Sequence, residues 1–213
     1  MRITVATLAF GNIPYFAAAE RINREYCRLH KYSFEITRPT LQCGRALVWC
    51  KVTGVSALLP KSDYVLYLDA DAYFVDHSKS IESIIKEHME GAAMLLGTDR
   101  RDRHFAWSDT NANTGVFIVR NCAEAFRILG EWWTAPNRYD GRWLWTWPPD
   151  QGAFNYIVRQ LFEEDTIHVI PYQHINGRDG TFIRHLVGMS LPERTETLES
   201  EACRLVGVGD KKV

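Results

Sequence analysis

Apolar positions in residues 1–70 form short runs separated by longer stretches with helical spacing. Residues 3–8, 33–36 and 64–68 are predicted to be buried strands. The spacing after the first strand predicts an amphipathic helix, and a second helix is predicted over residues 45–59, ended by Pro60. The predicted buried positions are Tyr15, Ala19, Ile22, Tyr26 and Leu29 in the first helix, and Leu47, Cys50, Gly54 and Leu58 in the second. This β-α-β-α-β order favours a parallel sheet with helices on its faces.

The rest of the chain continues this alternation. The pattern predicts helices over residues 78–90, 122–133 and 150–162, and strands over residues 92–97, 115–119 and 167–170. Ser78 and Asn121 are the predicted N-caps of the first two helices. Residues 134–149 carry aromatic side chains and prolines without periodicity. We therefore predict a single α/β domain over residues 1–213, with helices on the faces of its sheet.

Composition narrows the possible functions. The 213 residues suit one well-buried domain, and the formal net charge of −1 argues against a nucleic-acid partner. The five cysteines are scattered without a Cys-x-x-Cys pair, which is typical of reduced thiols in a cytosolic protein. The apolar N-terminal run is too short for a signal peptide, and no run reaches membrane-spanning length. We expect a cytoplasmic protein without a membrane segment, and the oligomeric state stays open.

Two carboxylates one residue apart, Asp69 and Asp71, follow the third predicted strand. Both side chains should leave the sheet at its carboxyl edge, where α/β folds bind ligands. This spacing suits a hard divalent cation, Mg²⁺ or Mn²⁺, with phosphate oxygens and water completing its coordination. The alternative is a strand end or turn, where Asp is common. The apolar run and the preceding alternation favour the metal site.

Six blocks of the sequence occur in an order typical of one enzyme family. They are residues 22–32, Trp49-Cys50-Lys51, residues 64–71, residues 113–117, Asp150-Gln151 and residues 185–188. Together they resemble the nucleotide-sugar glycosyltransferases of the GT-A fold, and they are most similar to the galactosyl- and xylosyltransferase group. The resemblance covers about residues 3–190 and implies a mixed, mostly parallel sheet flanked by helices in a single GT-A domain. It implies transfer of a sugar from a UDP-sugar to a saccharide hydroxyl, with retention, in glycan or glycoprotein synthesis.

The resemblance also implies how the domain is divided. Residues 1–98 would form the nucleotide-binding half, residues 99–190 the sugar and acceptor half, and residues 191–213 a C-terminal tail. The compact size is also similar to that of a virus-encoded glycosyltransferase domain, which would place it in the host cytoplasm.

A late histidine completes the metal site that the resemblance implies. Asp69, Asp71 and His185 would bind Mn²⁺ or Mg²⁺, and Gly188 would let the backbone approach the diphosphate. From its spacing alone, His185 could instead be a packed or solvated side chain. Met189 and Ser190 stand where the group often has Cys or Lys-Pro, so contacts to the diphosphate should differ after Gly188.

The donor pocket that the resemblance implies has three parts. The nucleotide would contact Thr7, Ala9, Tyr15, Asp69 and Ala70; the phosphates would contact Arg45 and Lys51; the sugar would contact Asn111, Asn113, Thr114 and Gly115. The alternatives are packing at a strand end for the first part, exposed helix charges for the second and a turn before a strand for the third.

Asp150 and Gln151 are the implied catalytic residues, because a carboxylate and an amide can face the anomeric carbon. In a retaining route they would stabilise an oxocarbenium-like state, whereas in an inverting route Asp150 would be the general base. Asp150 could instead be only a helix N-cap, because it follows two prolines and opens a predicted helix.

Aromatic side chains are concentrated in one segment. Five of the seven tryptophans lie within sixteen residues: Trp132, Trp133, Trp143, Trp145 and Trp147. Most are expected in the core, and one or two on the acceptor side, where flat aromatic faces suit sugar rings. Tyr139 and Arg142 would add contacts to hydroxyls. The charged loop over residues 100–104 is expected to be a lid or an acceptor contact.

Two other classes of protein share parts of this pattern. Phosphohydrolases that form an aspartyl-phosphate also have Asp-x-Asp after a strand, and residues 208–210 are similar to their late acidic motif. Their first motif usually lies on the first strand, and Tyr73 stands where Thr or Val is usual. A non-catalytic carbohydrate-binding module would use the tryptophans but would not need Asp69, Asp71 and His185 together.

Overall fold

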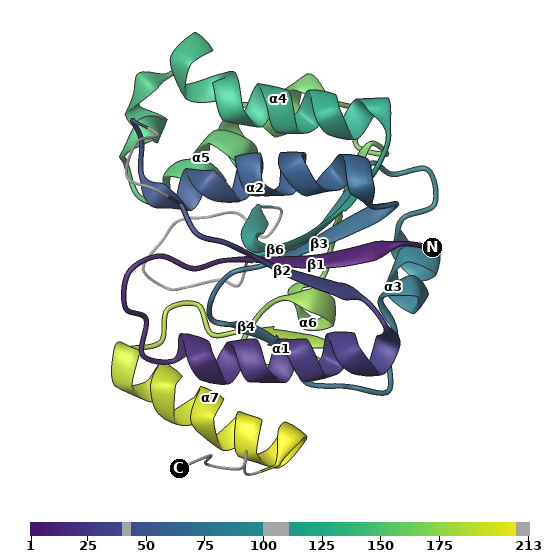
Figure 1. The fold of residues 1–213 in the computed structure, drawn as a ribbon. Coiled ribbons are helices and arrows are strands. Elements are labelled where there is room, and N and C mark those ends of the chain that lie inside the picture. Colours follow the sequence, from purple (N-terminus) through teal and green to yellow (C-terminus); the bar gives the residue numbers. More distant parts are fainter. Residues whose placement is uncertain (40–43, 100–110, 208–213) are drawn as a thin grey trace.

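The structure is a computed structural model that describes residues 1–39, 44–99 and 111–207 (Figure 1). The strands are β1 (Ile3–Leu8), β2 (Ser33–Thr37), β3 (Tyr64–Leu68), β4 (Ala72–Phe74), β5 (Met94–Thr98), β6 (Ala112–Arg120), β7 (Ile167–Ile170) and β8 (Ile183–His185). The α-helices are α1 (Phe16–His30), α2 (Cys50–Leu58), α3 (Ile81–His88), α4 (Ala123–Arg138), α5 (Pro149–Tyr156), α6 (Tyr172–Ile175) and α7 (Leu191–Val206). Short 3-10 helices span Leu47–Trp49, Leu59–Lys61, Gly141–Leu144 and Val158–Leu161.

A six-stranded sheet with the order β2-β1-β3-β6-β5-β7 forms the centre of the domain. β1 pairs in parallel with β2 and β3, and β5 pairs in parallel with β7. β6 is antiparallel to both of its neighbours, so its first residues lie beside the carboxyl end of β3. β4 and β8 form a separate antiparallel pair. The mixed, mostly parallel sheet of a single domain confirms the predicted fold class.

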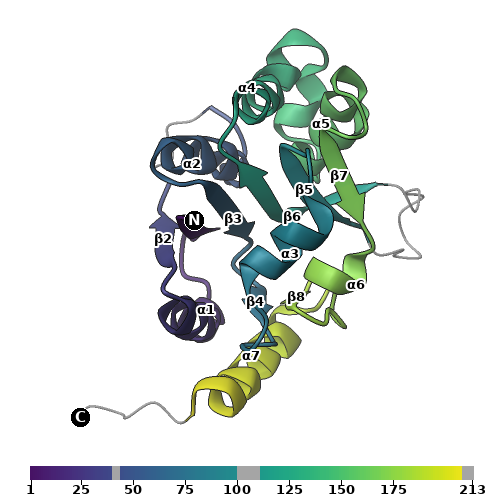
Figure 2. The ribbon, with the colours of Figure 1, turned by 90° about the vertical axis from the view of Figure 1, so that its right-hand side faces the viewer.

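Helices cover both faces of the central sheet (Figures 1 and 2). Val65 and Tyr67 of β3 pack in the cluster that includes residues of α2, α4 and α5, whereas Leu66 and Leu68 pack in the cluster of α1, α3 and α6. Because successive side chains of a strand point to opposite faces, one continuous apolar run supplies both clusters. α7 lies outside α1, and Leu198 joins the two helices through a third cluster.

Two predicted buried helix faces are corrected by the structure. In α1 the predicted Ala19, Ile22 and Tyr26 are buried, but Leu29 is 48% exposed, and Asn23 and Cys27 are buried as well. Asn23 is buried because its amide donates to the Ala72 carbonyl and its oxygen accepts from the Phe74 N–H, which attaches α1 to β4. In α2 the buried residues are Cys50, Lys51, Val52 and Val55, so the predicted face that included Gly54 and Leu58 is wrong.

Two predicted helix caps are also wrong. The N-cap of α3 is Ser80, whose side chain accepts from the Ser83 N–H. Ser78 instead donates to the Asp76 carboxylate in a turn before the helix. The N-cap of α4 is Cys122, with no side-chain cap, while the Asn121 amide donates to the Ser62 carbonyl. Ser78 and Asn121 therefore lie in turns that precede α3 and α4.

Several elements were not predicted from the pattern. β4 and β8 have three residues each, which is too short to show a period of two. α7 is a polar helix in residues 191–206, begun by a capping box between Ser190 and Glu193. The cysteines Cys27, Cys122 and Cys203 are free thiols. No helix in the described part of the chain is long and apolar enough to cross a membrane.

Candidate functional site

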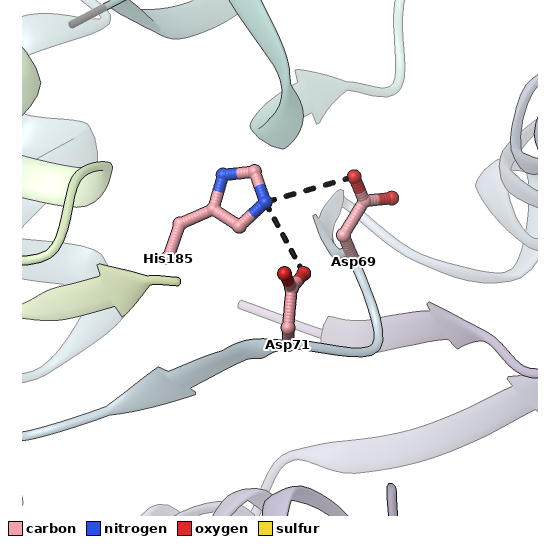
Figure 3. Close-up of side chains that lie close together, drawn as sticks. All are labelled: Asp69, Asp71 and His185. Atoms are coloured by element: carbon pink, nitrogen blue, oxygen red, sulfur yellow. Dashed lines mark ion pairs between the residues drawn. The ribbon is translucent and has the colours of Figure 1, made fainter. Parts of the chain in front are cut away.

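Asp69, Asp71 and His185 converge at the carboxyl edge of the sheet (Figure 3). Asp69 directly follows β3, Asp71 precedes β4, and His185 is the last residue of β8, opposite Ala72 in the β4–β8 pair. His185 Nε2 lies 3.2 Å from Asp71 Oδ1 and 3.8 Å from Asp69 Oδ2. The three ligand atoms lie within 4.8 Å of one another. The small β4–β8 sheet thus brings a residue late in the sequence to the acidic motif.

The surroundings of this cluster fit a divalent cation. Asn176 donates its amide to the Thr98 carbonyl, so its oxygen faces His185 Nδ1 at 2.7 Å and accepts the proton there. In the neutral imidazole this interaction places the proton on Nδ1, which leaves Nε2, the atom that faces the two carboxylates, available as a metal ligand. At Gly115, a Cβ would lie 2.2 Å from His185 Cε1 and 2.8 Å from Asp69 Oδ2, so only glycine leaves room for both ligands. Carboxylate oxygens and an imidazole nitrogen are a donor set that Mn²⁺ and Mg²⁺ sites accept.

Charges inside the cluster shift the acid–base properties of the ligands. Burial raises the pKa of the Asp69 carboxyl, and the opposing effects of Lys51 and His185 do not cancel this. Burial would also raise the pKa of Asp71, but His185 and Arg194 outweigh it and hold that pKa below its usual range. Burial lowers the pKa of His185, but Asp71 outweighs burial and the net pKa is raised. A cation bound between these groups would stabilise the charged form of Asp69, which burial disfavours.

Lys51 connects the acidic motif to a third carboxylate. Its Nζ lies 3.1 Å from Asp69 Oδ1 and 3.0 Å from Asp150 Oδ2, and it donates to the Thr114 carbonyl. The side chain is only 3% exposed. Burial lowers the pKa of Lys51, but Asp150 and Asp69 outweigh it and raise the net pKa above the usual value. The ammonium is therefore charged, and it holds the carboxylates of Asp69 and Asp150 close together.

A hydrogen-bond network fixes the start of β6 against α5. Thr114 donates its hydroxyl to Asp150 Oδ2, and its N–H donates to Gln151 Oε1. Gln151 donates its amide to Asp99 Oδ2, and Asn113 donates to Asp99 Oδ1. The Asn113 oxygen accepts from the Gly115 N–H. These buried polar groups are therefore paired and rigid, which positions Asp150 and Gln151 precisely at the edge of the sheet.

These groups share one cleft of about 620 Å³. One part of its wall is polar, with the carboxylates, Lys51 and the Asn113–Gly115 segment. Another part is formed by apolar and aromatic side chains: Leu8, Phe10, Ile13, Tyr15, Val48, Val187 and Trp147. A cleft of this size, with few convergent polar groups beside apolar walls, is typical of a small-molecule site.

A family model of nucleotide-diphospho-sugar transferases matches residues 16–196, most of the chain. The chain belongs to this family. The membership confirms the predicted class of glycosyltransferases, and it favours this class over the phosphohydrolases and the non-catalytic modules.

Solved structures share the fold of this nucleotide-diphospho-sugar transferase. A crystal structure of a glycosyltransferase involved in the glycosylation of the major capsid of PBCV-1 superposes with a TM-score of 0.76, at 22% identity, over 94% of this chain and 100% of that one. The galactosyltransferase LgtC superposes with a TM-score of 0.58, at 13% identity, over 98% of each chain. These similarities confirm the GT-A fold.

Plant enzymes are among the curated relatives of this transferase. Galactomannan galactosyltransferase 1 of Cyamopsis tetragonoloba is 27% identical over 112 residues, which are 51% of this chain and 25% of that protein. Xyloglucan 6-xylosyltransferase 4 of Arabidopsis thaliana is 26% identical over 125 residues, which are 55% of this chain and 23% of that protein. The matched region spans about a quarter of the length of these relatives.

Most of the predicted site residues of the transferase line the cleft. They are Tyr15, Lys51, Asp69, Ala70, Asp71, Asn113, Thr114, Gly115, Asp150, Gln151, His185 and Gly188. Two structural alternatives are excluded by the local geometry. Asn113 and Thr114 lie within β6 rather than in a turn, and Asp150 lies inside α5, whose N-cap is Pro148.

Four other predicted residues do not line the cleft. Thr7 is buried within β1, and Ala9 donates its N–H to the Thr37 carbonyl. Arg45 packs 3.8 Å from the centre of a Trp133 ring and donates to the Trp133 carbonyl. Asn111 accepts from the Asp99 N–H through its backbone carbonyl. The loop over residues 100–104 and the motif at residues 208–210 lie outside the described residues.

The sequence pattern missed four polar residues in or next to the cleft. Arg178 and Arg194 line the cleft and add positive charge close to Gly188. Arg194 lies 3.3 Å from Asp71 Oδ2 and donates to the Tyr15 hydroxyl. Asp99 and Asn176 orient other site residues through hydrogen bonds. Arg194 lies on α7, which was expected to be part of a tail, and no short motif marks the other three.

Proposed function

We propose that this chain transfers a sugar from a UDP-sugar to a hydroxyl of a saccharide, with retention of configuration and with a divalent metal ion. The observation that carries the proposal is the convergence of Asp69, Asp71 and His185 in the wall of a cleft, in a chain of this family. The names of the relatives, a galactosyltransferase and a xylosyltransferase, support transfer of a hexose or pentose in glycan synthesis.

The three ligands would hold Mn²⁺ or Mg²⁺. When bound, the ion supplies positive charge that stabilises the departing diphosphate. Arg178 and Arg194 are close to Gly188 in the same wall, where the chain departs from the family pattern at Met189 and Ser190. We assign both arginines to the diphosphate, because guanidinium groups bind phosphate oxygens in a bidentate geometry. The apolar wall at Phe10 and Ile13 would receive the nucleoside.

Asp150 and Gln151 would face the transferred sugar from α5. Asp150 Oδ2 already accepts hydrogen bonds from the Lys51 ammonium and the Thr114 hydroxyl, so this oxygen is occupied by donors of the protein. This pairing favours retention over an inverting route with Asp150 as the general base. A fixed carboxylate next to a fixed amide oxygen and nitrogen suits electrostatic stabilisation of an oxocarbenium-like state.

A panel of nucleotide sugars tests this function. The wild-type protein is incubated with each sugar nucleotide, with Mn²⁺ or EDTA, with and without saccharide acceptors, and the released nucleotide is measured. We expect release from a UDP-sugar that requires the metal. Asp71→Asn should lose at least about a hundredfold of this activity, whereas Asp63→Asn, at the opposite end of β3, should retain it. Failure of the wild type to release nucleotide from any donor contradicts the proposal, and metal-independent release contradicts the metal assignment.

A further inference from the structure

Three of the five clustered tryptophans are explained by packing. Trp132 is fully buried, and its indole N–H donates to the Asp150 carbonyl. The ring of Trp143 covers Gly152, where a Cβ would lie 2.0 Å from it, and stacks on Tyr156 at 5.4 Å. Trp133 packs against the Arg45 guanidinium. These three side chains stabilise α4 and α5, so their aromatic character needs no ligand.

Trp145 and Trp147 have no such explanation. Their exposed fractions are 65% and 72%, the largest among tryptophans in the part of the chain that the structure describes. Neither indole has a hydrogen bond or a ring contact within that part. Exposing two indoles forfeits a large hydrophobic gain, because burying one aromatic side chain removes roughly 150–250 Å² from water. Such a pair on a folded surface usually marks a binding site.

The position of the pair indicates which ligand it serves. Trp147 and Pro148 line the cleft together with Asp150 and Gln151, while Trp145 lies two residues earlier and does not line it. Trp147 therefore lies in the wall close to where the donor sugar would lie, and Trp145 lies outside this wall. The Trp145 N–H donates to the carbonyl of Arg142, whose exposed side chain forms an ion pair with Asp140 at 2.6 Å. Flat apolar faces with polar groups at their edges match the C–H faces and hydroxyls of sugar rings.

We propose that Trp145 and Trp147 form an aromatic platform that binds an extended saccharide acceptor of at least two sugar rings. The inference rests on the proposed function and specifies its acceptor. Trp147 stacks on the ring that carries the reacting hydroxyl, and Trp145 stacks on the next ring outward. The acceptor reacts at its end while the remaining chain lies on the surface. The enzyme should therefore discriminate acceptors by length.

Acceptor length and matched variants test the platform. The probes are the tetrasaccharides and monosaccharides of the cello, xylo, manno and galacto series, used with the donor that the nucleotide-sugar panel identifies. We expect wild type to prefer at least one tetrasaccharide over its monosaccharide by about tenfold or more in kcat/KM. Trp145→Ala should raise KM for that tetrasaccharide about tenfold with kcat nearly retained, and remove most of the length preference. Trp145→Phe should restore part of it.

Phe126→Ala is the matched control, because Phe126 is an exposed aromatic side chain on α4 that does not line the cleft. It should leave both KM values unchanged. UDP affinity with Mn²⁺ should stay within about twofold in Trp145→Ala, since Trp145 lies outside the cleft. A wild type without any length preference overturns the platform, and so does an unchanged KM in Trp145→Ala. If the wild type is a dimer and the Trp145→Ala variant is a monomer, the two tryptophans bind a second copy of the chain. This outcome also overturns the platform. Failure of the proposed function is distinguished by the absence of nucleotide release in wild type.

Discussion

The ammonium group of Lys51 lies 3.0 Å from the Asp150 carboxylate, which joins α2 to α5 at the edge of the sheet. The same group lies 3.1 Å from Asp69, so one buried cation offsets two carboxylates that the site holds close together. A fully buried lysine is rare unless it is paired in this way. The structure of the cleft therefore depends on the buried ammonium group of Lys51, although a hydrophobic pattern predicts that a lysine lies on the surface.

Replacing Lys51 by Met should destabilise the fold. The substitution preserves the length of the side chain but leaves the Asp150 carboxylate buried without its cation, a loss of about 3 kcal/mol or more in the free energy of unfolding. Urea denaturation measures the loss. Lys61→Met, on the exposed surface at the end of the 3-10 helix Leu59–Lys61, is the control and should stay within about 0.5 kcal/mol of wild type. A Lys51→Met protein as stable as the control would contradict the role of the ion pair.

The strands were predictable because each central strand is one apolar run. β1, β3 and β7 have the predicted bounds; β1 and β3 are apolar except at Thr4 and Thr7, and both of their faces are covered. The helix faces were less predictable. Asn23 and Lys51 are buried through hydrogen bonds and ion pairs with residues far away in the sequence, and a local periodicity contains no information on such partners.

The acidic motif was predictable from its position after an apolar strand, whereas His185 was predictable only through a resemblance. The spacing of residues in the sequence does not predict that His185 lies close to Asp71. The contact depends on the pairing of β4 with β8, two strands of three residues each. Arg194 was missed for a related reason: it reaches the cleft from a polar surface helix that packs across α1. Arg45 is a residue that was predicted in the site but lies outside it: it was expected to contact phosphate and instead packs on Trp133.

Asn176→Ala should weaken metal binding while the fold is retained. Asn176 holds the proton on His185 Nδ1, and the loss of such an orienting partner typically reduces metal affinity about 10- to 100-fold. Calorimetric titration with Mn²⁺ measures the change. Asn155→Ala is the matched control: Asn155 is also buried and bonded to the backbone, at Ala112, but it is not bonded to a predicted metal ligand. Equal Mn²⁺ affinities in the two variants would exclude an orienting role for Asn176.

Arg178→Gln should weaken binding of the diphosphate more than binding of the nucleoside. The Arg178 side chain lines the cleft, and its Nε donates to the Val187 carbonyl at 2.9 Å, next to Gly188. Losing a charged hydrogen bond should reduce UDP affinity about tenfold in the presence of Mn²⁺, with little change for uridine. Arg120 donates to the Gly91 carbonyl at 3.0 Å from the opposite end of β6, so Arg120→Gln is the matched control. A parallel loss for UDP and uridine in Arg178→Gln would indicate a structural role only.

Gly115→Ala should abolish metal binding through a steric effect alone. A Cβ at this position would lie 2.2 Å from His185 Cε1 and 2.8 Å from Asp69 Oδ2, and the backbone of β6 cannot retreat because Asp69 donates its N–H to the Gly115 carbonyl at 2.7 Å. The imidazole must therefore leave the plane in which Nε2 faces both carboxylates. We expect Mn²⁺ affinity to fall at least about a hundredfold, with a loss of stability of about 1 to 3 kcal/mol from overpacking.

Gly130→Ala separates this steric effect from the general consequence of adding a methyl group. Gly130 lies inside α4, and a Cβ there meets nothing within 4 Å. Alanine is the better helix former, so this variant should gain about 0.5 to 1 kcal/mol in stability and bind Mn²⁺ as wild type does. Both variants are measured by thermal unfolding and by Mn²⁺ titration. Because no ligand atom is removed in Gly115→Ala, a loss of Mn²⁺ binding there alone would show that the distance between His185 and Asp69 determines affinity. Wild-type Mn²⁺ affinity in Gly115→Ala would mean that the ion binds elsewhere.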